Sequence, residues 1–570
     1  MSAVSVLLNG VPLAGRWGAP SSFRRRSSLF TVYLNGHQLF MRQIIRIVTL
    51  AAGLLTVNVA EAQAPRHVKG ERPRLVVFIT IDQMRADYFA RFGKQLTGGL
   101  KRLHDGGAFF ARGFQDHGIT ETAPGHASVM SGRFPVHTGI VMNSQGVNQR
   151  GVPLIGAADL GASPARFIGT TLTDWMRAVD PATRVLSASR KDRGAILPIG
   201  RAKADVYWYA SSNGTFTTSR YYADTLPTWV QRFNAQKIVQ SHIGTAWTPL
   251  REPSAYREPD SVAIENSGHD YYFPHQFRDS AATRTFVEFP WMDEMTAAFV
   301  LAGAREMQLG ESRSRTDLLA VSFSTLDAIG HRFGPDSKEL HDHILRLDGL
   351  LGAFLDSLDA RVGKGRYVVA LTGDHGMSPY PTLKSPNYPN GNAKIVSIDA
   401  IWQNFLTRLK MAGVDSTALA LEDGVVFVNK RDVFTKAGVN ADSAFAGFGA
   451  EVLRLQGVQR ADLITTIANA DTVHDTIARR WMHMFATDGP ARLVVSLTPY
   501  SYWQSRNYAT HGSPNDPDAN VPILFWGVGV KRGQYSTTIR TVDMAPTLAA
   551  ILHITPMEQL DGHVLKQVVR

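Results

Sequence analysis

Six side chains that can bind metal ions stand at or near the ends of four apolar segments. They are three aspartates and three histidines: Asp82, Asp327, His331, Asp374, His375 and His511. Any single one has an ordinary explanation, because Asp residues commonly start the turns that follow strands. As a set they predict more, since three carboxylates in an apolar scaffold repel one another unless cations neutralise them. Six ligands divide naturally into two metal sites of three or four each, with positions left open for substrate.

A threonine in the stretch ITETAPGHASVMSG, residues 119–132, could supply a nucleophile. Pro124 suits the first turn of a helix, so Thr122 is expected just before a helix, near its free N–H groups and positive dipole end. Two interpretations are open at this point. Thr122 is either an N-cap residue or a nucleophile placed where an anion is stabilised.

The four apolar segments predict buried strands of a parallel sheet. They cover residues 75–81, 318–324, 367–373 and 521–527. Helical periodicity follows them at 338–358 and 543–554. This alternation predicts a doubly wound α/β fold, a mostly parallel sheet flanked by helices, in which ligands bind beyond the carboxyl ends of the strands. Asp327 and His331, four residues apart, would share one face of a helical turn.

Two stretches, about 190–290 and 390–500, do not follow the alternation of strands and helices. We interpret both as insertions that form a cap over the sheet. Residues 65–570 would then make up one catalytic domain with two insertions.

Five motifs, in this order along most of the chain after residue 64, resemble the alkaline phosphatase superfamily. They are DQMRADY (82–88), TAPGHAS (122–128), STLDAIGHRFGP (324–335), TGDHGM (372–377) and THGS (510–513). The resemblance implies one zinc ion bound by Asp327, His331 and His511. It implies a second zinc ion bound by Asp82, Asp374 and His375, with Thr122 as the nucleophile bound to it.

Two zinc ions would answer the chemical problem that a threonine nucleophile poses. A threonine hydroxyl is a poor nucleophile at neutral pH and needs a metal ion or a base to remove its proton. Two zinc ions about 4 Å apart can stabilise the attacking and the leaving oxygens of an in-line displacement. The expected reaction passes through a phosphothreonine at Thr122, which water then hydrolyses.

The residues around Thr122 narrow the choice within the superfamily. Sulfatases carry a modified Cys or Ser in a C/S-x-P-x-R pattern. Here Thr122 occupies that position and Gly125-His126 follow the proline, which argues against a sulfatase. A phosphate monoesterase and a nucleotide pyrophosphatase/phosphodiesterase share the zinc site and the Thr nucleophile. A non-catalytic binding protein is disfavoured, because no ligand or nucleophile position has been lost.

Cationic donors favour the monoesterase, because a monoester dianion has a third free oxygen where a diester has a second alkyl group. SASRKDRGAILP (187–198) contains Lys191 and Arg193. Alone, RKDR also suits a solvated basic turn. The segment resembles the Lys-x-Arg element of the phosphate-irrepressible alkaline phosphatases, in which an Asn after the nucleophile assists. Asn143 lies at that place, so the resemblance implies that these three side chains contact the phosphoryl oxygens.

The sequence departs from the best-known bacterial alkaline phosphatases in one respect. Those enzymes hold a magnesium ion partly through an acid on the strand before the Asp/His pair, and LLAVSFSTL (318–326) contains no acid. We therefore expect no Mg²⁺ site, with Lys191 and Arg193 providing positive charge instead.

The composition limits which metal ligands, binding partners and substrates are possible. The 570 residues include no Cys, which excludes disulfides and thiolate ligands, so a metal ion must be bound by His, Asp or Glu. The formal net charge is +11, but the basic residues are scattered, which argues against nucleic-acid recognition. Positive charge still favours small anionic substrates such as phosphomonoesters. Whether the protein is a monomer or a homodimer stays open.

The first 64 residues have the pattern of an upstream segment followed by a signal peptide. From Met41 a basic start (Arg42, Arg46) precedes an apolar stretch and the small residues Ala62-Gln63-Ala64. The stretch is too short and too polar for a stable membrane span. The signal peptide is therefore expected at 41–64, and the protein in the periplasm or secreted.

Overall fold

The computed structural model describes residues 72–381, 393–505 and 507–570. The expected signal peptide lies outside these residues. No helix among them combines the length and the apolar character needed to cross a bilayer.

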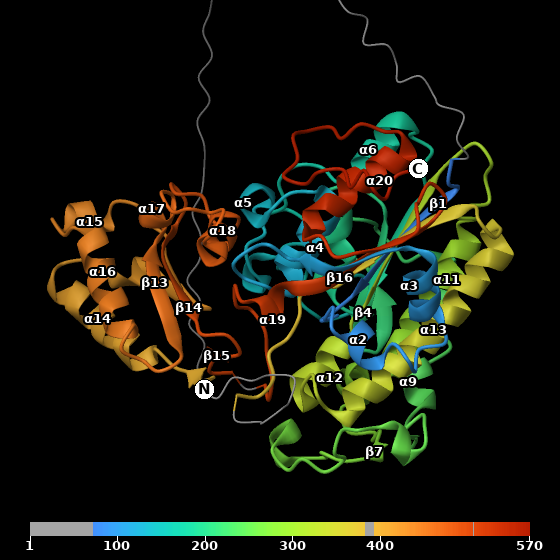
Figure 1. Ribbon diagram of the computed structural model, residues 1–570, viewed down its shortest axis with the longest axis horizontal. Helices are drawn as coiled ribbons and strands as arrows, with labels where there is room; N and C mark the ends of the chain where they lie inside the picture. The colour runs from blue at the N-terminus through green and yellow to red at the C-terminus, as the bar shows by residue number, and fades with distance from the viewer. Residues whose placement is uncertain (1–71, 382–392, 506) are drawn as a thin grey trace, which may run out of the picture. The chain divides into compact units, whose positions relative to one another are not determined.

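A ten-stranded sheet forms the centre of the molecule (Figure 1). Its strands follow the order β17-β2-β16-β9-β1-β8-β3-β4-β5, and β18 also pairs with β2. Their bounds are β1 Leu75–Ile81, β2 Ala108–Phe114, β3 Val185–Ser189, β4 Asp205–Ala210, β5 Thr215–Thr217, β8 Asp317–Phe323, β9 Tyr367–Thr372, β16 Asn520–Gly527, β17 Gly533–Tyr535 and β18 Ile539–Arg540.

The middle of the sheet is parallel, as expected. Strand β1 pairs in parallel with β8 and with β9, and β3 pairs in parallel with β8 and with β4. Strand β16 is an exception to our expectation, because it runs antiparallel to both β9 and β2. The chain enters β16 beside the carboxyl end of β9, where Ile523 pairs with Thr372, and must therefore run back. An apolar run contains no information about this direction.

Helices cover both faces of the sheet, so its strands are apolar on both sides. In β1, Val77 and Ile79 belong to a core formed with α3, α11 and α13, while Val76 and Phe78 pack with α4, α6 and α20. The bounds of these helices are α3 Gly99–Gly106, α11 Trp291–Glu306, α13 Lys338–Val362, α4 Thr122–Ser131, α6 Leu172–Val179 and α20 Met544–Leu552. The predicted doubly wound α/β fold is confirmed.

The first expected insertion begins later than residue 190. Strands β4 and β5 belong to the central sheet, with Tyr207 and Tyr209 on one face and Val206 and Trp208 on the other. Aromatic residues on both faces of VYWYA hid this strand in the sequence. The remainder, from about residue 218, contains α8 (Thr228–Asn234), α9 (Ile238–Ser241) and the two-stranded sheet of β6 (Ala246–Trp247) and β7 (His275–Gln276).

The second expected insertion, at about 390–500, corresponds to residues 393–505, which contain a sheet of their own. We call these residues the cap module. The sheet is antiparallel, in the order β11-β12-β14-β13, with bounds Leu419–Glu422, Val425–Val428, Ala491–Leu497 and Val458–Leu463. One face packs on α14 (Asp399–Met411) and α16 (Ala441–Val452). The other packs on α17 (Ile464–Ile467) and α18 (Thr476–Met482), together with Ile119 and Met142 of the segments around Thr122.

Candidate active site

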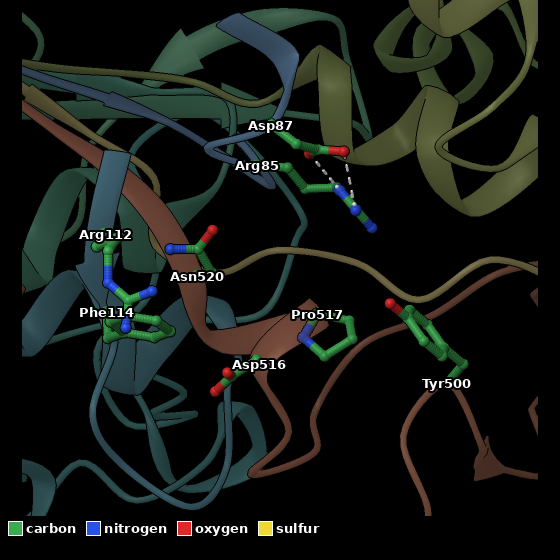
Figure 2. Close-up of a pocket in the computed structure, with 8 residues that line it drawn as sticks. All are labelled: Arg85, Asp87, Arg112, Phe114, Tyr500, Asp516, Pro517 and Asn520. Atoms are coloured by element: carbon green, nitrogen blue, oxygen red, sulfur yellow. Dashed lines mark hydrogen bonds and ion pairs between the residues drawn. The ribbon is translucent and has the colours of Figure 1, made fainter. Parts of the chain in front are cut away.

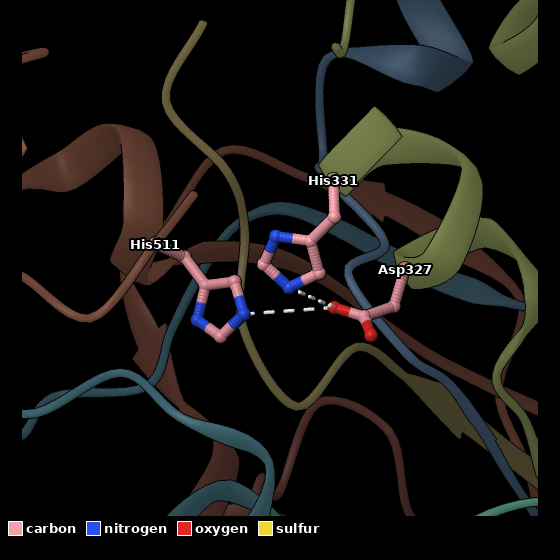
Figure 3. A group of neighbouring side chains, drawn as sticks. All are labelled: Asp327, His331 and His511. Carbon is pink, nitrogen blue, oxygen red and sulfur yellow. Dashed lines mark ion pairs between the residues drawn. The ribbon is translucent and has the colours of Figure 1, made fainter. Parts of the chain in front are cut away.

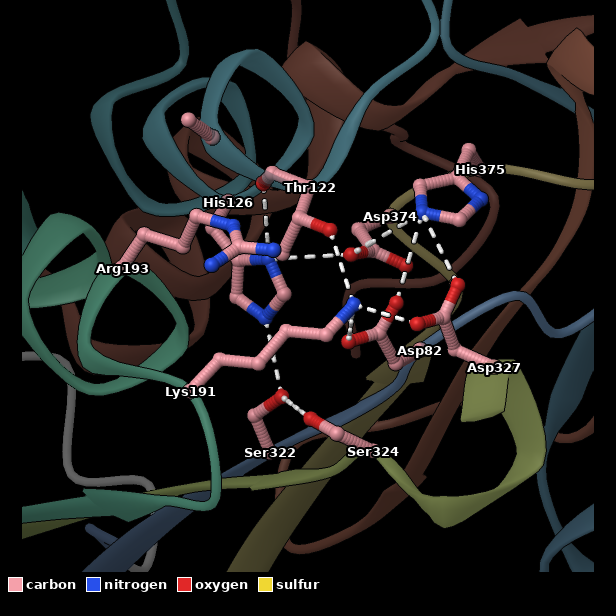
Figure 4. Close-up of polar contacts among 12 residues, drawn as sticks. Asp82, Thr122, His126, Lys191, Arg193, Ser322, Ser324, Asp327, Asp374 and His375 are labelled. Carbon is pink, nitrogen blue, oxygen red and sulfur yellow. Dashed lines mark hydrogen bonds and ion pairs between the residues drawn. The ribbon is translucent and has the colours of Figure 1, made fainter. Parts of the chain in front are cut away.

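The sheet brings the ends of three parallel strands to one level. Thr80 pairs with Ser322 on one side and with Thr372 on the other. Asp82 follows β1, Asp374 and His375 follow β9, and α12 (Thr325–Phe333), which comes after β8, carries Asp327 and His331. Parallel strands end at the same edge, so residues far apart in the sequence meet there. Figure 4 shows most of this cluster.

Asp327, His331 and His511 form the first group of possible metal ligands (Figure 3). Asp327 Oδ1 lies 3.3 Å from His331 Nε2 and 3.5 Å from His511 Nε2. These are the three residues that the resemblance assigned to one zinc ion.

The second group joins Asp82, His375 and, again, Asp327. His375 Nε2 lies 3.3 Å from Asp82 Oδ1 and 4.0 Å from Asp327 Oδ1. Asp374, which we expected in this group, places Oδ2 3.7 Å from His375 Nε2. All six expected ligands therefore gather in one place, with Asp327 between the two groups.

Hydrogen bonds to the backbone orient all three histidines. The Nδ1 atoms of His331, His375 and His511 lie 2.8, 2.9 and 2.8 Å from the carbonyl oxygens of Ala509, Gly376 and Thr120. Because Nδ1–H donates to these carbonyls, the lone pair of each Nε2 is left to face the carboxylates. Burial lowers the pKa of His375, but the neighbouring carboxylates outweigh it and raise the pKa to about 9. A proton and a metal ion would therefore compete for this Nε2.

The buried donor atoms and the negative charge of the cluster are those expected of a site that binds divalent cations. Among the described residues, both carboxylate oxygens of Asp82, Oδ2 of Asp374 and Nε2 of His375 are buried, and their close polar contacts are ion pairs with Lys191 and with histidines of the site rather than regular hydrogen bonds. Lys191 Nζ lies 2.7 Å from Asp82 Oδ2 and 2.6 Å from Asp327 Oδ2, and the Arg190 guanidinium lies 3.6 Å from Asp327 Oδ2. These two cations do not neutralise three carboxylates. Oxygen and imidazole donors suit zinc and similar ions, so the residues fit such ions.

Thr122 is the first residue of α4 and is 1% exposed. Glu121 is the N-cap residue, and the Thr122 hydroxyl instead accepts a hydrogen bond from Lys191 Nζ at 3.0 Å. Its oxygen therefore faces the two ligand groups at the positive end of a helix, where an anion is stabilised. This placement favours the nucleophile over the N-cap interpretation.

The other expected substrate-binding residues surround Thr122 from separate segments. Asn143 Oδ1 accepts from the Ala123 backbone N–H at 2.9 Å, and its Nδ2 makes no hydrogen bond among the described residues, so it is free to donate. The half-buried Arg193 side chain lies near Thr122 in Figure 4, and its nearest ion pair is with Asp192 at 3.6 Å.

Three residues of the site escaped the sequence analysis. Gln83 donates its backbone N–H to Asp374 Oδ1 at 3.0 Å. Fully buried His126 places Nδ1 2.9 Å from Thr122 O and 3.1 Å from Asp374 Oδ2. Burial and the Asp423 carboxylate of the cap module raise the pKa of Glu121 to about 7. Gln83 and His126 lie within the quoted motifs, but no spacing rule identified their partners.

Gly125 shows how closely α4 approaches the strand end. A Cβ atom there would lie 2.3 Å from the Asp374 carbonyl oxygen. We expect Gly125→Ala to lower the free energy of unfolding by about 1–3 kcal/mol, as overpacking does, and to displace Asp374. Gly447→Ala in α16, where nothing lies within 4 Å, is the control. It should stabilise the protein by about 0.5–1 kcal/mol. Denaturant unfolding checks both, and equal effects would contradict the close approach.

Comparison with known proteins agrees with this geometry. Residues 76–411 match the family "type I phosphodiesterase / nucleotide pyrophosphatase". The chain is 31% identical over 529 residues to the alkaline phosphatase PhoV of Synechococcus elongatus, covering 88% of this chain and 93% of PhoV. It is 31% identical over 532 residues to PhoK of Sphingomonas sp, covering 88% and 92%.

A solved structure gives the same answer for the fold. The crystal structure of the alkaline phosphatase PafA superposes with a TM-score of 0.80 at 26% identity, over 88% of this chain and 99% of PafA. The resemblance drawn from the motifs is confirmed. The chain therefore belongs to the type I phosphodiesterase/nucleotide pyrophosphatase family within the alkaline phosphatase superfamily, and is of the PafA and PhoK type.

Proposed function

We propose that this protein is a phosphate monoester hydrolase, an alkaline phosphatase, that acts through a phosphothreonine intermediate at Thr122. The observation that carries the proposal is the contact of Thr122 Oγ1 with Lys191 Nζ, which also touches Asp82 and Asp327, one from each ligand group. The alkaline phosphatases among its relatives support the same activity.

Two zinc ions per chain fit the ligand set. Asp327, His331 and His511 would hold one, and Asp82, Asp374 and His375 would hold the other together with Thr122. When bound, these ions would favour the ionised hydroxyl and stabilise negative charge on the attacking and leaving oxygens.

The residues of the chain supply the rest of the reaction. Thr122 Oγ forms a bond to phosphorus as the bond to the leaving alcohol oxygen breaks. Asn143 Nδ2, Lys191 Nζ and the Arg193 guanidinium donate to the phosphoryl oxygens. The proton that Thr122 loses in this step ends on the leaving alcohol. Water then attacks phosphorus and breaks its bond to Thr122 Oγ, which releases inorganic phosphate and returns the hydroxyl of Thr122.

The same donors favour a monoester over a diester. Lys191 and Arg193 bring two positive charges to the third free oxygen that only the monoester dianion possesses. The family name also covers phosphodiesterases, so the second candidate is a nucleotide pyrophosphatase/phosphodiesterase. Rates with p-nitrophenyl phosphate and bis(p-nitrophenyl) phosphate separate the two. We expect the monoester to react far faster, and faster diester hydrolysis would replace the proposal by the second candidate.

Removing the metal ions should abolish activity reversibly. We expect dialysis against a chelator to leave an inactive protein and zinc to restore it, with two zinc ions per chain measured by mass spectrometry. Magnesium should not be needed, because β8 contributes no acid to the site. An apoprotein that is already active, or that zinc fails to reactivate, would contradict a zinc enzyme.

We also propose that the protein is exported to the periplasm or secreted after removal of residues 41–64 and anything before them. N-terminal sequencing of exported protein should begin near Pro65. A start at Met1 would contradict the proposal, which is independent of the catalytic one.

A further inference from the structure

An arginine of the cap module is buried against the two loops that carry Thr122 and His511. Arg480, in α18, has a side chain that is 2% exposed. Its Nε donates to Asp116 Oδ1 at 3.3 Å, one terminal nitrogen donates to the Pro514 carbonyl at 2.6 Å, and the other donates to Asp516 Oδ1 at 2.8 Å. A buried arginine whose three nitrogens bind two segments that are distant in the sequence fixes those segments relative to one another.

The acceptors belong to the two loops that lead to the catalytic centre. Asp116 lies between the end of β2 and Thr122, and Pro514 follows His511. The two loops also bond directly, since Thr120 Oγ1 donates to Ser513 O at 2.8 Å. His511 Nδ1 donates to Thr120 O at 2.8 Å, and this bond sets the direction of His511 Nε2. A shift between the loops would therefore move the nucleophile and a metal ligand apart.

Asp116 is held firmly as an anion at the centre of this arrangement. Besides Arg480, it pairs with Arg479, Arg540 and His483. Burial raises the pKa of Asp116, but the hydrogen bonds from His483 and Arg479 and the charge of Arg480 outweigh it and hold the pKa well below its usual range. The carboxylate is thus a fixed acceptor for Arg480.

Packing connects α18 to the same loop. A Cβ on Gly118 would lie 2.2 Å from a ring carbon of Trp481, so the indole lies directly on the loop backbone. Trp481 Nε1 donates to Ser496 Oγ at 2.8 Å, within the cap module. The loop that leads to Thr122 therefore rests on residues of the cap module.

The third acceptor of Arg480 is of a different kind. The Asp516 side chain is 69% exposed and borders a hollow of about 270 Å³, next to Phe114 and Pro517 (Figure 2). Exposed ion pairs contribute little. The contacts that matter are therefore the buried ones, to Asp116 and to the Pro514 carbonyl.

We propose that Arg480 is a positioning residue for catalysis, which holds the Thr122 loop and the His511 loop in the register that the active site requires. The proposal rests on the proposed function. It gives the cap module a part in assembling the catalytic centre. Arg480 touches neither substrate nor metal ligand and acts through the backbone of the two loops.

The neighbouring Arg479 is a matched control. It lies on the same helix and binds the same carboxylate, with Nε 2.9 Å and a terminal nitrogen 3.1 Å from the two Asp116 oxygens. Its remaining bond goes to Thr472 O, inside the cap module. Arg479 therefore joins the cap module to the Thr122 loop but makes no hydrogen bond or ion pair with the described residues of the His511 loop.

The test compares Arg480→Met and Arg479→Met as zinc-loaded full-length enzymes. We expect both to lower Tm. Arg480→Met should also lower kcat for p-nitrophenyl phosphate about 10–100-fold with KM little changed, because misplaced reacting groups cost rate rather than binding. It should release zinc to a chelator faster. Arg479→Met should keep kcat and zinc release within about twofold of wild type.

Two further variants distinguish a loss of positioning from a general loss of folding stability. Arg480→Lys keeps the charge but cannot reach all the acceptors, so it should lose part of kcat while Tm stays near that of wild type. Asp516→Ala, which removes the exposed contact of Arg480, should change neither kcat nor Tm. If kcat falls and zinc release accelerates equally in the Arg479 and Arg480 variants, or only in proportion to the loss of Tm, the positioning role is wrong. If wild type prefers a diester, the proposed function fails, and the same comparison made with that diester still decides the role of Arg480.

Discussion

Replacing Thr122 by alanine should abolish phosphatase activity while leaving the metal site intact. We expect kcat/KM for p-nitrophenyl phosphate to fall about 10⁴-fold or more, the scale seen when a covalent nucleophile is removed. Zinc content should stay near that of wild type, because the six other ligands remain. Steady-state rates together with metal analysis check both parts.

Thr122→Ser is the matched control, because it keeps the hydroxyl and removes only a methyl group. It should retain most of kcat. Acid-quenched wild-type enzyme given radiolabelled substrate should carry phosphate on the peptide that contains Thr122. An alanine variant that keeps more than about a tenth of wild-type kcat would rule out Thr122 as the nucleophile.

Replacing Lys191 and Arg193 together by alanine should harm monoester hydrolysis much more than diester hydrolysis. Each charge-assisted hydrogen bond contributes about 1.5–3 kcal/mol. We therefore expect kcat/KM for the monoester to fall about 10³-fold and that for the diester by about tenfold or less. Parallel assays with p-nitrophenyl phosphate and bis(p-nitrophenyl) phosphate measure the ratio.

The two single variants separate substrate contacts from effects on the metal site. Lys191 touches Asp82, Asp327 and Thr122, so its removal can also change zinc binding, which metal analysis will report. Among the described residues, Arg193 makes no hydrogen bond or ion pair with the six Asp and His ligands, and its loss should lower the monoester rate at unchanged zinc content. Equal losses for monoester and diester in Arg193→Ala would contradict a contact with the dianion.

The direction and pairing of strands were only partly predictable. The four apolar segments became β1, β8, β9 and β16 within a residue of the expected bounds, because burial on both faces leaves a continuous apolar run. The antiparallel direction of β16 and the membership of β4 in the central sheet were not predicted. Both depend on partners distant in the sequence, and a short apolar run is equally compatible with either direction.

The candidate site was likewise only partly predictable from the sequence. Local rules and the family motifs predicted the six candidate ligands and Thr122, because polar residues that end buried strands are visible in the sequence. The structure brings these residues together, and their roles stay predictions. The contacts of His126 with Asp374 and of Arg480 with Asp116 and Pro514 join segments that no pattern connects.

The sequence by itself determined which chemical groups this protein can bring to catalysis. Residue type fixes whether a side chain can bind a metal ion, attack phosphorus or carry charge, and periodicity fixes which segments are buried. The tertiary structure alone decided the sharing of Asp327 between two ligand groups, the place of Lys191 among the carboxylates and the reach of the cap module to the Thr122 loop. The physical reason is that these arrangements arise from packing between distant segments, whose energies depend on all partners at once.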